Sequence, residues 1–275
     1  MQKNNPIGIF DSGYGGLTVM KEIVKVLPHY DYIYLGDNAR APYGTRSYET
    51  VYKYTLQAVE LLFSKGCKLV ILACNTASAK ALRTIQQKDL PLIAPERRVL
   101  GVIRPVTECI NQFTRSNHIG VLGTTGTILS NSYPIEINKF YPKITVVQEA
   151  CPLWVPLVES NEFESQGADF FIKKHIEKIL TSDPLIDAII LGCTHYPLLI
   201  NKIKKYISSD IQIISQGEIV SHSLANYLQR HPEIEALCSK SGQLKFYTTD
   251  SAEIFTNFAS LFFGQPAKAE KIILN

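Results

Sequence analysis

Two cysteines, Cys74 and Cys193, stand where the sequence changes from an apolar run to small polar residues. Each is expected at the end of a strand and just before a helix, whose positive end stabilises a thiolate. A thiol with an ordinary pKa near ~8.5 can act as a base or as an acid. Two such thiols facing one carbon atom could remove a proton from one side and deliver a proton to the other. The pattern therefore predicts reversible proton transfer at a carbon, with Cys74 and Cys193 as the catalytic groups.

Three further ionisable residues are candidates for the same site. Asp11 ends the first apolar run, and His195 lies two residues after Cys193, so that one loop could present both the thiol and the imidazole. Either group could tune a thiol or hold a substrate ammonium group. Glu159 follows the apolar segment 151–158, which is an unusual place for a carboxylate. Asp11, His195 and Glu159 are therefore candidate catalytic residues.

Short polar turns follow four of the apolar runs, at residues 11–13, 74–76, 123–127 and 193–195. Any one of these turns alone could merely cap a helix. Together, their hydroxyl, amide and glycine residues can bring O–H and N–H donors to an anion at the carboxyl ends of parallel strands. The glycine clusters have neither dinucleotide-binding spacing nor a P-loop lysine. The turns therefore favour a small anion such as a carboxylate.

The elements that must position these residues alternate between short apolar runs and longer amphipathic segments. This alternation is typical of parallel strands joined by crossover helices. The clearest helix covers residues 47–65, with Ser47 able to cap its start and Gly66 after its end. Because most runs are β-branched throughout, both faces of each sheet are expected to be covered, which indicates an α/β fold. The expected strands are residues 7–10, 32–35, 68–73, 99–102, 119–122, 145–148, 188–191, 211–214 and 245–248.

A weak internal repeat divides the chain into two similar halves. Residues 7–13 resemble residues 119–125, and residues 69–76 resemble residues 188–195, in the same order and at similar offsets. Such a repeat can reveal the architecture directly. It predicts two similar α/β domains with mostly parallel sheets, related by pseudo-two-fold symmetry, with the active site in the cleft between them.

Composition excludes several classes of protein. The chain has 275 residues, and its 28 basic and 25 acidic residues give a formal charge of +3 without a clustered basic stretch, so no nucleic-acid partner is expected. No uncharged apolar stretch approaches the ~18 residues of a membrane span. The six cysteines lack the paired spacing of a structural zinc site or a disulfide scaffold. We therefore expect a cytoplasmic protein that binds no membrane and no metal.

Six motifs follow one another along nearly the whole chain. They are IFDSGYGGL (9–17), LGDNARAPYG (35–44), ACNTAS (73–78), GVIRP (101–105), GTTGT (123–127) and LGCTHYPLL (191–199). In this order they resemble the motifs of the cofactor-independent glutamate racemases of bacterial cell-wall synthesis. The resemblance implies interconversion of L- and D-glutamate by a two-thiol proton transfer at the α-carbon, without a cofactor, supplying D-glutamate for peptidoglycan synthesis. It also implies a homodimer.

The same resemblance implies roles for individual residues. Cys74 matches the thiol that removes the α-proton of D-glutamate, and Cys193 matches the thiol that removes that of L-glutamate. Asp11 and His195 match the groups that assist proton transfer, while Glu159 matches an acidic residue with a supporting role.

The resemblance further implies a substrate-binding set and a division into domains. Asp37 matches a second supporting acidic residue. In such racemases the C-terminal segment returns to the first domain, so the domains are expected at 1–100 plus 211–275 and at 101–210. The implied substrate contacts are Asp11, Ser12, Pro42, Tyr43, Gly44, Asn75, Thr76, Thr124, Thr127 and Thr194.

Other interpretations of the residues remain open. One is a non-catalytic binding protein for an amino acid or dicarboxylate with the same two-domain cleft. Another is a hydrolase using Cys193 and His195, although the sequence has no nucleophile elbow. A zinc site built from Cys74, Cys193 and His195 is a third. Because the first strand begins at Ile7, without a long N-terminal extension, activation by a muramyl nucleotide precursor is not expected.

Overall fold

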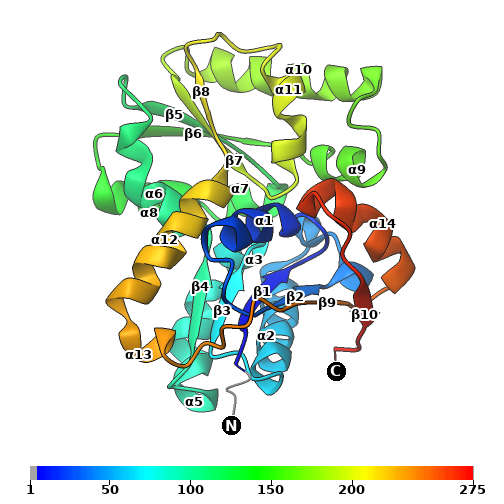
Figure 1. Cartoon of the computed structure of the whole chain (residues 1–275). Coiled ribbons are helices and arrows are strands. Elements are labelled where there is room, and N and C mark those ends of the chain that lie inside the picture. Colours follow the sequence, from blue (N-terminus) through cyan, green and yellow to red (C-terminus); the bar gives the residue numbers. More distant parts are fainter. Residues whose placement is uncertain (1–4, 275) are drawn as a thin grey trace.

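A computed structural model describes residues 5–274, which form two parallel β-sheets covered by helices (Figure 1). The first sheet has the strand order β10-β9-β2-β1-β3-β4, and the second has the order β6-β5-β7-β8. The strands are β1 (Ile7–Asp11), β2 (Tyr32–Gly36), β3 (Leu69–Leu72), β4 (Arg98–Gly101), β5 (His118–Gly123), β6 (Thr145–Ala150), β7 (Ala188–Gly192), β8 (Gln212–Ile214), β9 (Leu244–Thr248) and β10 (Ala269–Lys271).

The two sheets share one strand order. The run β2-β1-β3-β4 in the first sheet corresponds to β6-β5-β7-β8 in the second, and every pairing is parallel. The two sequence echoes fall on the corresponding central strands, β1 with β5 and β3 with β7. The prediction of two similar α/β domains is therefore confirmed.

The helices connect and cover these strands. Figure 1 places the four-stranded sheet above the six-stranded sheet, with α12 alongside the first domain and α1 and α14 near the junction. The helices are α1 (Leu17–Val26), α2 (Tyr48–Ser64), α3 (Asn75–Lys80), α4 (Leu82–Thr84), α5 (Leu90–Ile93), α6 (Ile103–Cys109), α7 (Thr125–Leu129), α8 (Ser132–Phe140), α9 (Trp154–Glu159), α10 (Gln166–Ser182), α11 (Ile200–Ile203), α12 (Gln216–Arg230), α13 (Pro232–Glu235) and α14 (Ala252–Phe263). Short 3₁₀ or π segments are η1 (Asn38–Arg40), η2 (Tyr43–Thr45), η3 (Ile85–Asp89), η4 (Ile110–Gln112) and η5 (Tyr196–Leu199).

All nine expected strands are present, each within two residues of its expected bounds. The helix expected at 47–65 is α2, and the side chain of Ser47 accepts a hydrogen bond from the backbone N–H of Thr50 at 3.2 Å. This bond satisfies one of the free donors of the first helical turn. The sequence did not predict β10, a short edge strand with the sequence AEK and no strand-like alternation.

The expected domain boundary at residue 211 needs a correction. It assigned the strand at 212–214 to the first domain, but β8 pairs with β7 of the second sheet, with Ile214 opposite Ile190. Both isoleucines are buried in the core of the second domain. We therefore propose that the chain returns to the first domain after Ile214, through α12, which packs against α1 and α6.

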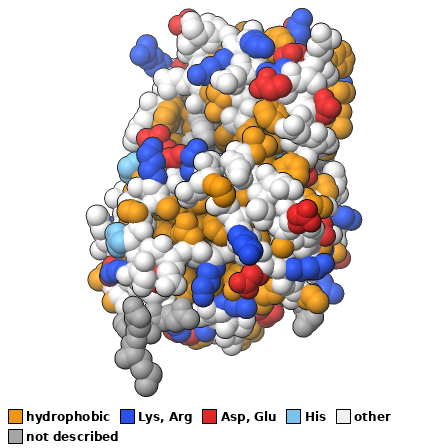
Figure 2. Space-filling view, turned by 45° about the vertical axis from the view of Figure 1, so that its right-hand side comes forward, with side chains coloured by type: hydrophobic (Ala, Val, Ile, Leu, Met, Phe, Trp, Pro, Cys, Tyr) orange, Lys and Arg blue, Asp and Glu red, His pale blue; other side chains and the backbone are white. Residues whose placement is uncertain are grey.

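The cores join the two domains into one body. One buried apolar cluster contains residues of both sheets, including Leu17 of α1 and Leu191 of β7, while two further clusters belong to one domain each. On the face drawn in Figure 2, basic and acidic side chains are interspersed without a continuous basic field. None of the helices among residues 5–274 is long and apolar enough to span a membrane.

Candidate active site

The four polar turns meet between the two domains, at the carboxyl ends of β1, β3, β5 and β7. The hydroxyl of Thr194 in the second domain lies 3.4 Å from Asp11 Oδ1 in the first. The hydroxyls of Thr76 and Thr124 are 2.9 Å apart across the same boundary. Ligands of open parallel sheets bind at this edge, so the structure brings the predicted residues together where a site is expected.

Cys74 is the N-cap of α3 and is 5% exposed. Its sulfur accepts the backbone N–H of Ala77 at 3.4 Å and lies 3.5 Å from Ser12 Oγ. Burial, followed by the charge of Asp11, raises the pKa of Cys74 to about 12, although the bonds to Ser12 and Ala77 act in the opposite direction. The helix start therefore does not outweigh burial, and the Cys74 side chain is a thiol at neutral pH.

Cys193 has a cationic partner that Cys74 lacks. Its sulfur lies 3.9 Å from His195 Nδ1, and His195 Nε2 lies 2.9 Å from Glu159 Oε1. Burial alone would lower the pKa of His195, but the hydrogen bonds to Cys193 and Glu159 raise it well above its ordinary value. An imidazolium at this position stabilises a thiolate on Cys193. Glu159, at the end of α9, is half-buried and completes the row of three groups.

Asp11 lies at the end of β1 with no exposed surface. Its Oδ2 accepts the backbone N–H of Gly13 at 2.9 Å. Burial raises the pKa of Asp11, and the positive charge of His195 and the backbone bonds from Gly13 and Gly16 only partly offset this rise. The carboxylate is thus near both halves of the site and is a suitable acceptor for a substrate ammonium group.

Three threonine hydroxyls form a buried triangle across the domain boundary. Thr76, Thr124 and Thr127 are separated by oxygen–oxygen distances of 2.9, 3.1 and 3.3 Å. Thr124 also caps α7 by accepting the N–H of Thr127 at 3.2 Å. Each hydroxyl carries one O–H group that can rotate toward an anion, so the triangle can receive a carboxylate.

The loop before α2 contributes backbone rather than side chains. Tyr43 is 1% exposed, and its hydroxyl donates to Asp37, which also accepts Arg40 Nε at 2.7 Å. Pro42 is exposed. Tyr43 and Gly44 open η2, where N–H groups have no intrahelical acceptor. A Cβ on Gly44 would lie 2.8 Å from Thr124 Cβ, so glycine is required where this loop meets the second domain.

Sequence reasoning missed three residues of this region. Tyr133 and Gln216 bind the side chain of Asn75, which follows Cys74. Gly15 lies against the loop that follows the second thiol, because a Cβ there would be 2.3 Å from Thr194 Oγ1 and 2.4 Å from His195 Nδ1. The motif containing Gly15 was recognised, but the close approach to another motif could not be read from it.

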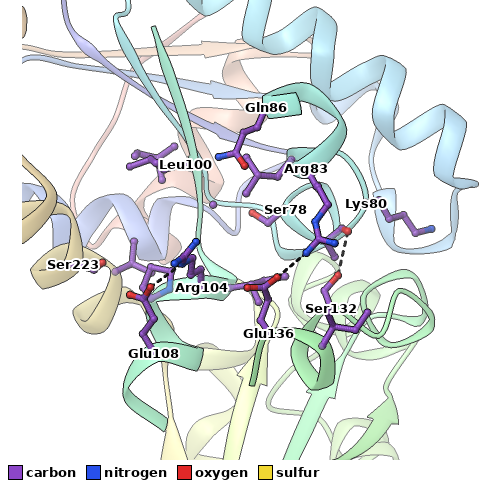
Figure 3. A pocket seen from close by; sticks show the side chains of 18 of the residues that line it. Ser78, Lys80, Arg83, Gln86, Leu100, Arg104, Glu108, Ser132, Glu136 and Ser223 are labelled. Carbon is purple, nitrogen blue, oxygen red and sulfur yellow. Dashed lines mark hydrogen bonds and ion pairs between the residues drawn. The ribbon is translucent and has the colours of Figure 1, made fainter. Parts of the chain in front are cut away.

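A separate cavity of about 930 Å³ lies between α3, α4, α6, α8 and α12 (Figure 3). Arg83 of α4 and Glu136 of α8 form an ion pair of 2.9 Å across it, and Arg104 pairs with Glu108 at 2.7 Å. None of the predicted site residues lines this cavity. Among residues 5–274, no three His, Cys, Asp or Glu side chains cluster in a way that could hold a metal ion.

Similarity to known proteins agrees with this geometry. Residues 7–222 match the model of a family described as Asp/Glu/hydantoin racemase. A glutamate racemase of Geobacter metallireducens is 40% identical over 258 residues, which cover 94% of this chain and 92% of that protein.

Two solved structures resemble the whole chain. The crystal structure of a glutamate racemase isoform from Bacillus anthracis has a TM-score of 0.89 and 35% identity, covering 99% of this chain and 98% of that chain. The crystal structure of a glutamate racemase from Francisella tularensis in complex with D-glutamate has a TM-score of 0.87 and 34% identity, covering 99% of each chain.

Proposed function

This chain belongs to the Asp/Glu/hydantoin racemase family, and from that premise we propose how its residues act. The reaction is the interconversion of L- and D-glutamate. Cys74 and Cys193 are the two acid–base groups, one on each side of the α-carbon. The observation that carries this assignment is a pair of buried thiols at corresponding strand ends of two similar domains.

In the direction from L-glutamate, Cys193 is the base. Its thiolate, stabilised by His195, takes the α-proton and becomes a thiol, while the electron pair of the broken C–H bond stays on the substrate. The Cys74 thiol then donates its proton to the opposite face of the carbon, and that electron pair forms the new C–H bond. One proton is taken and one is given, so the net charge of site and substrate is unchanged.

In the direction from D-glutamate, the two sulfurs exchange roles. Cys74 must first lose its proton, which its burial and the charge of Asp11 oppose. Ser12 and the N–H of Ala77 are the groups that favour the Cys74 thiolate. The two directions thus use different supporting groups for the same step.

The negative charge that develops on the substrate needs fixed donors. A carbanion beside a carboxylate is very unstable, and preorganised donors commonly make the largest catalytic contribution. Thr76, Thr124 and Thr127 provide three hydroxyls for one substrate carboxylate. Ser12, Asn75 and Thr194 are the remaining side chains that can donate to the substrate, and Asp11 can accept its ammonium group.

Burial of both sulfurs strengthens these interactions. Cys74 is 5% exposed and Cys193 is 6% exposed. A site closed to water has a low local dielectric constant, and a carbanion formed there is protected from adventitious protonation. Contacts across the domain boundary, such as that between Thr76 and Thr124, close the site.

The test is to incubate the purified protein with L-glutamate in deuterium oxide, without added cofactor, and to follow optical rotation and α-proton loss together. We expect the rotation to decay to zero while the newly formed D-glutamate carries deuterium from the second thiol. Because the remaining L-glutamate should keep its proton early in the reaction, the label distinguishes two bases from one. Label appearing equally early in both enantiomers would contradict the two-thiol assignment.

The same experiment separates the alternatives. A binding protein would take up glutamate, seen by calorimetry, with neither rotation nor label changing. A hydrolase using Cys193 and His195 would cleave an activated ester while Cys74→Ala left that activity unchanged. Neither alternative has a use for the buried thiol at the end of β3.

Three broader proposals accompany the reaction. We propose that the D-glutamate supplies peptidoglycan synthesis, that the enzyme acts in the cytoplasm, and that it forms a homodimer. All six cysteines are free, which supports a reducing compartment. Light scattering of the purified protein measures its mass, and a monomer at micromolar concentration would contradict the dimer.

A further inference from the structure

Three buried side chains beside the site form a closed ring of hydrogen bonds. Asn75 Nδ2 donates to Gln216 Oε1 at 2.7 Å, Gln216 Nε2 donates to the hydroxyl of Tyr133, and that hydroxyl donates to Asn75 Oδ1 at 2.8 Å. The three residues are 2%, 3% and 0% exposed, respectively. Within the ring, each side chain donates one hydrogen bond and accepts one.

The ring links the segment that carries Cys74 to the domain that carries Cys193. Asn75 directly follows Cys74 at the start of α3, whereas Tyr133 belongs to α8 of the second domain. The Tyr133 ring packs on the backbone just before Cys193, because a Cβ on Gly192 would lie 3.2 Å from Tyr133 Cε2. Gln216 begins α12, the segment through which the chain returns to the first domain.

Resting on the proposed function, we propose that Tyr133 and Gln216 are positioning residues for the proton transfer. They act through Asn75, whose carboxamide they hold in one orientation toward the substrate carboxylate. The Asn75 amide has two N–H groups, of which the ring uses one. The other is available to the substrate.

The ring opposes rotation of the Asn75 amide. Turning that group alone by half a turn would place its oxygen against Gln216 Oε1, which can only accept, so that hydrogen bond would be lost. It would also place the Asn75 nitrogen against the Tyr133 hydroxyl, whose O–H would then have lost its acceptor. Buried polar groups without partners are costly, so the arrangement strongly favours the observed orientation. Without the Tyr133 hydroxyl, one of these two restraints disappears, and an Asn75 oxygen could then face and repel the substrate carboxylate.

The first variant to make is Tyr133→Phe, which removes one oxygen and keeps the ring that packs on Gly192. We expect kcat/KM to fall by about tenfold. That is the size of effect expected when the hydrogen bond from the Asn75 amide to the ionised substrate carboxylate is weakened. The fall must be equal for L- and D-glutamate, because the two enantiomers have equal free energies. Racemisation is measured by circular dichroism from each enantiomer.

The matched control is Tyr32→Phe. The Tyr32 hydroxyl is also buried and donates to the carbonyl of Leu27 at 2.8 Å, far from the site in the fold. Both variants should lose a similar amount of thermal stability, but only Tyr133→Phe should lose activity. A folded Tyr133→Phe enzyme with the kcat/KM of the wild type would overturn the proposal.

The decisive measurement is a double-mutant cycle with Asn75→Ala. If Tyr133 acts through Asn75, then adding Tyr133→Phe to Asn75→Ala should change kcat/KM by less than about twofold, because no amide remains to be oriented. A purely structural role predicts that the two losses multiply, and that result would refute the inference. If Tyr133→Phe does not fold, Gln216→Met enters the same cycle. A wild-type protein that fails to racemise glutamate would instead refute the proposed function.

Discussion

The two thiols occupy the same position in two similar sheets, yet their surroundings differ in charge. Cys74 has the neutral hydroxyl of Ser12 and one backbone N–H beside it, and burial, followed by the charge of Asp11, raises its pKa. Cys193 has an imidazole 3.9 Å away whose far nitrogen is held by Glu159. The repeat therefore supplies the geometry, and the residues around each strand end supply the chemistry.

This difference gives the two thiols different electrostatic surroundings. The imidazolium stabilises a thiolate on Cys193, whereas burial keeps the proton on Cys74. In the proposed mechanism, Cys193 is the base toward L-glutamate, next to this imidazole. A fold with pseudo-two-fold symmetry thus gives an enzyme whose two halves are chemically unequal.

The largest expected effect comes from removing one thiol at a time. Cys74→Ala and Cys193→Ala should each lower racemisation by at least about 10³-fold, because each removes an acid–base group that has no substitute. Cys74→Ala should still exchange the α-proton of L-glutamate with solvent deuterium, and Cys193→Ala only that of D-glutamate. Proton NMR in deuterium oxide measures both. Exchange of both enantiomers by either variant would contradict the assignment of sides.

Gly15→Ala should disturb the Cys193 side selectively. The new methyl group would lie 2.3 Å from Thr194 Oγ1 and 2.4 Å from His195 Nδ1, so the loop with the imidazole must move. Displacing a catalytic group by about 1 Å can lower activity by about 10²-fold. Gly167→Ala is the control, because its methyl would meet only Ser165 Oγ, at 3.5 Å. Normal racemisation by Gly15→Ala would mean that His195 does not act on Cys193.

Glu159→Gln should make the protonated form of His195 less stable while leaving the imidazole in place. Glu159 helps to raise the pKa of His195, so the neutral amide should lower that pKa and the imidazolium should be lost at a lower pH. We expect about tenfold lower kcat/KM at pH 8, with the alkaline limb of the pH profile shifted to lower pH. The control is Glu162→Gln, an exposed carboxylate three residues later. An alkaline limb that does not move would show that Glu159 does not control the pKa of His195.

The smallest effect is expected from Ser12→Ala on the Cys74 side. Because the bond to Ser12 lowers the pKa of Cys74, its loss should raise that pKa further and disfavour the Cys74 thiolate. We expect kcat from D-glutamate to fall about threefold more than kcat from L-glutamate, as for one neutral hydrogen bond. Ser182→Ala, on the exposed end of α10, is the control. Equal losses of kcat would show that Ser12 serves the substrate and not the thiol.

Much of the fold could be predicted from the sequence because its strands are short, apolar and β-branched. The strand β10 was missed since Ala269, Glu270 and Lys271 carry no strand pattern, and they form a strand by pairing with β9. The boundary at residue 211 came from the family resemblance, and it placed β8 with the first domain although that strand pairs with β7 of the second sheet. The sheet that a strand joins depends on packing, in this case of Ile214 in the second core.

Some residues of the candidate site could likewise be predicted from the sequence, and others could not. Cys74, Cys193 and His195 could be predicted because each stands in a local pattern of strand, polar turn and helix. Tyr133 and Gln216 could not, since a tyrosine in one helix and a glutamine at the start of another resemble ordinary core and cap residues. Their contact with Asn75 exists only after three distant elements have packed together.

Burial of two unequal sulfurs also has a consequence after the reaction, because the protonation state of the enzyme should depend for a short time on the direction of its last turnover. In the proposed mechanism, once L-glutamate has become D-glutamate, the proton is on Cys193 and absent from Cys74, so the protein would leave each turnover in a different form from the one that began it. On that mechanism, the enzyme would process D-glutamate but not L-glutamate until Cys74 has regained a proton and Cys193 has lost one. With both sulfurs nearly closed to solvent, we expect this return to the starting form to limit throughput when one enantiomer is in large excess.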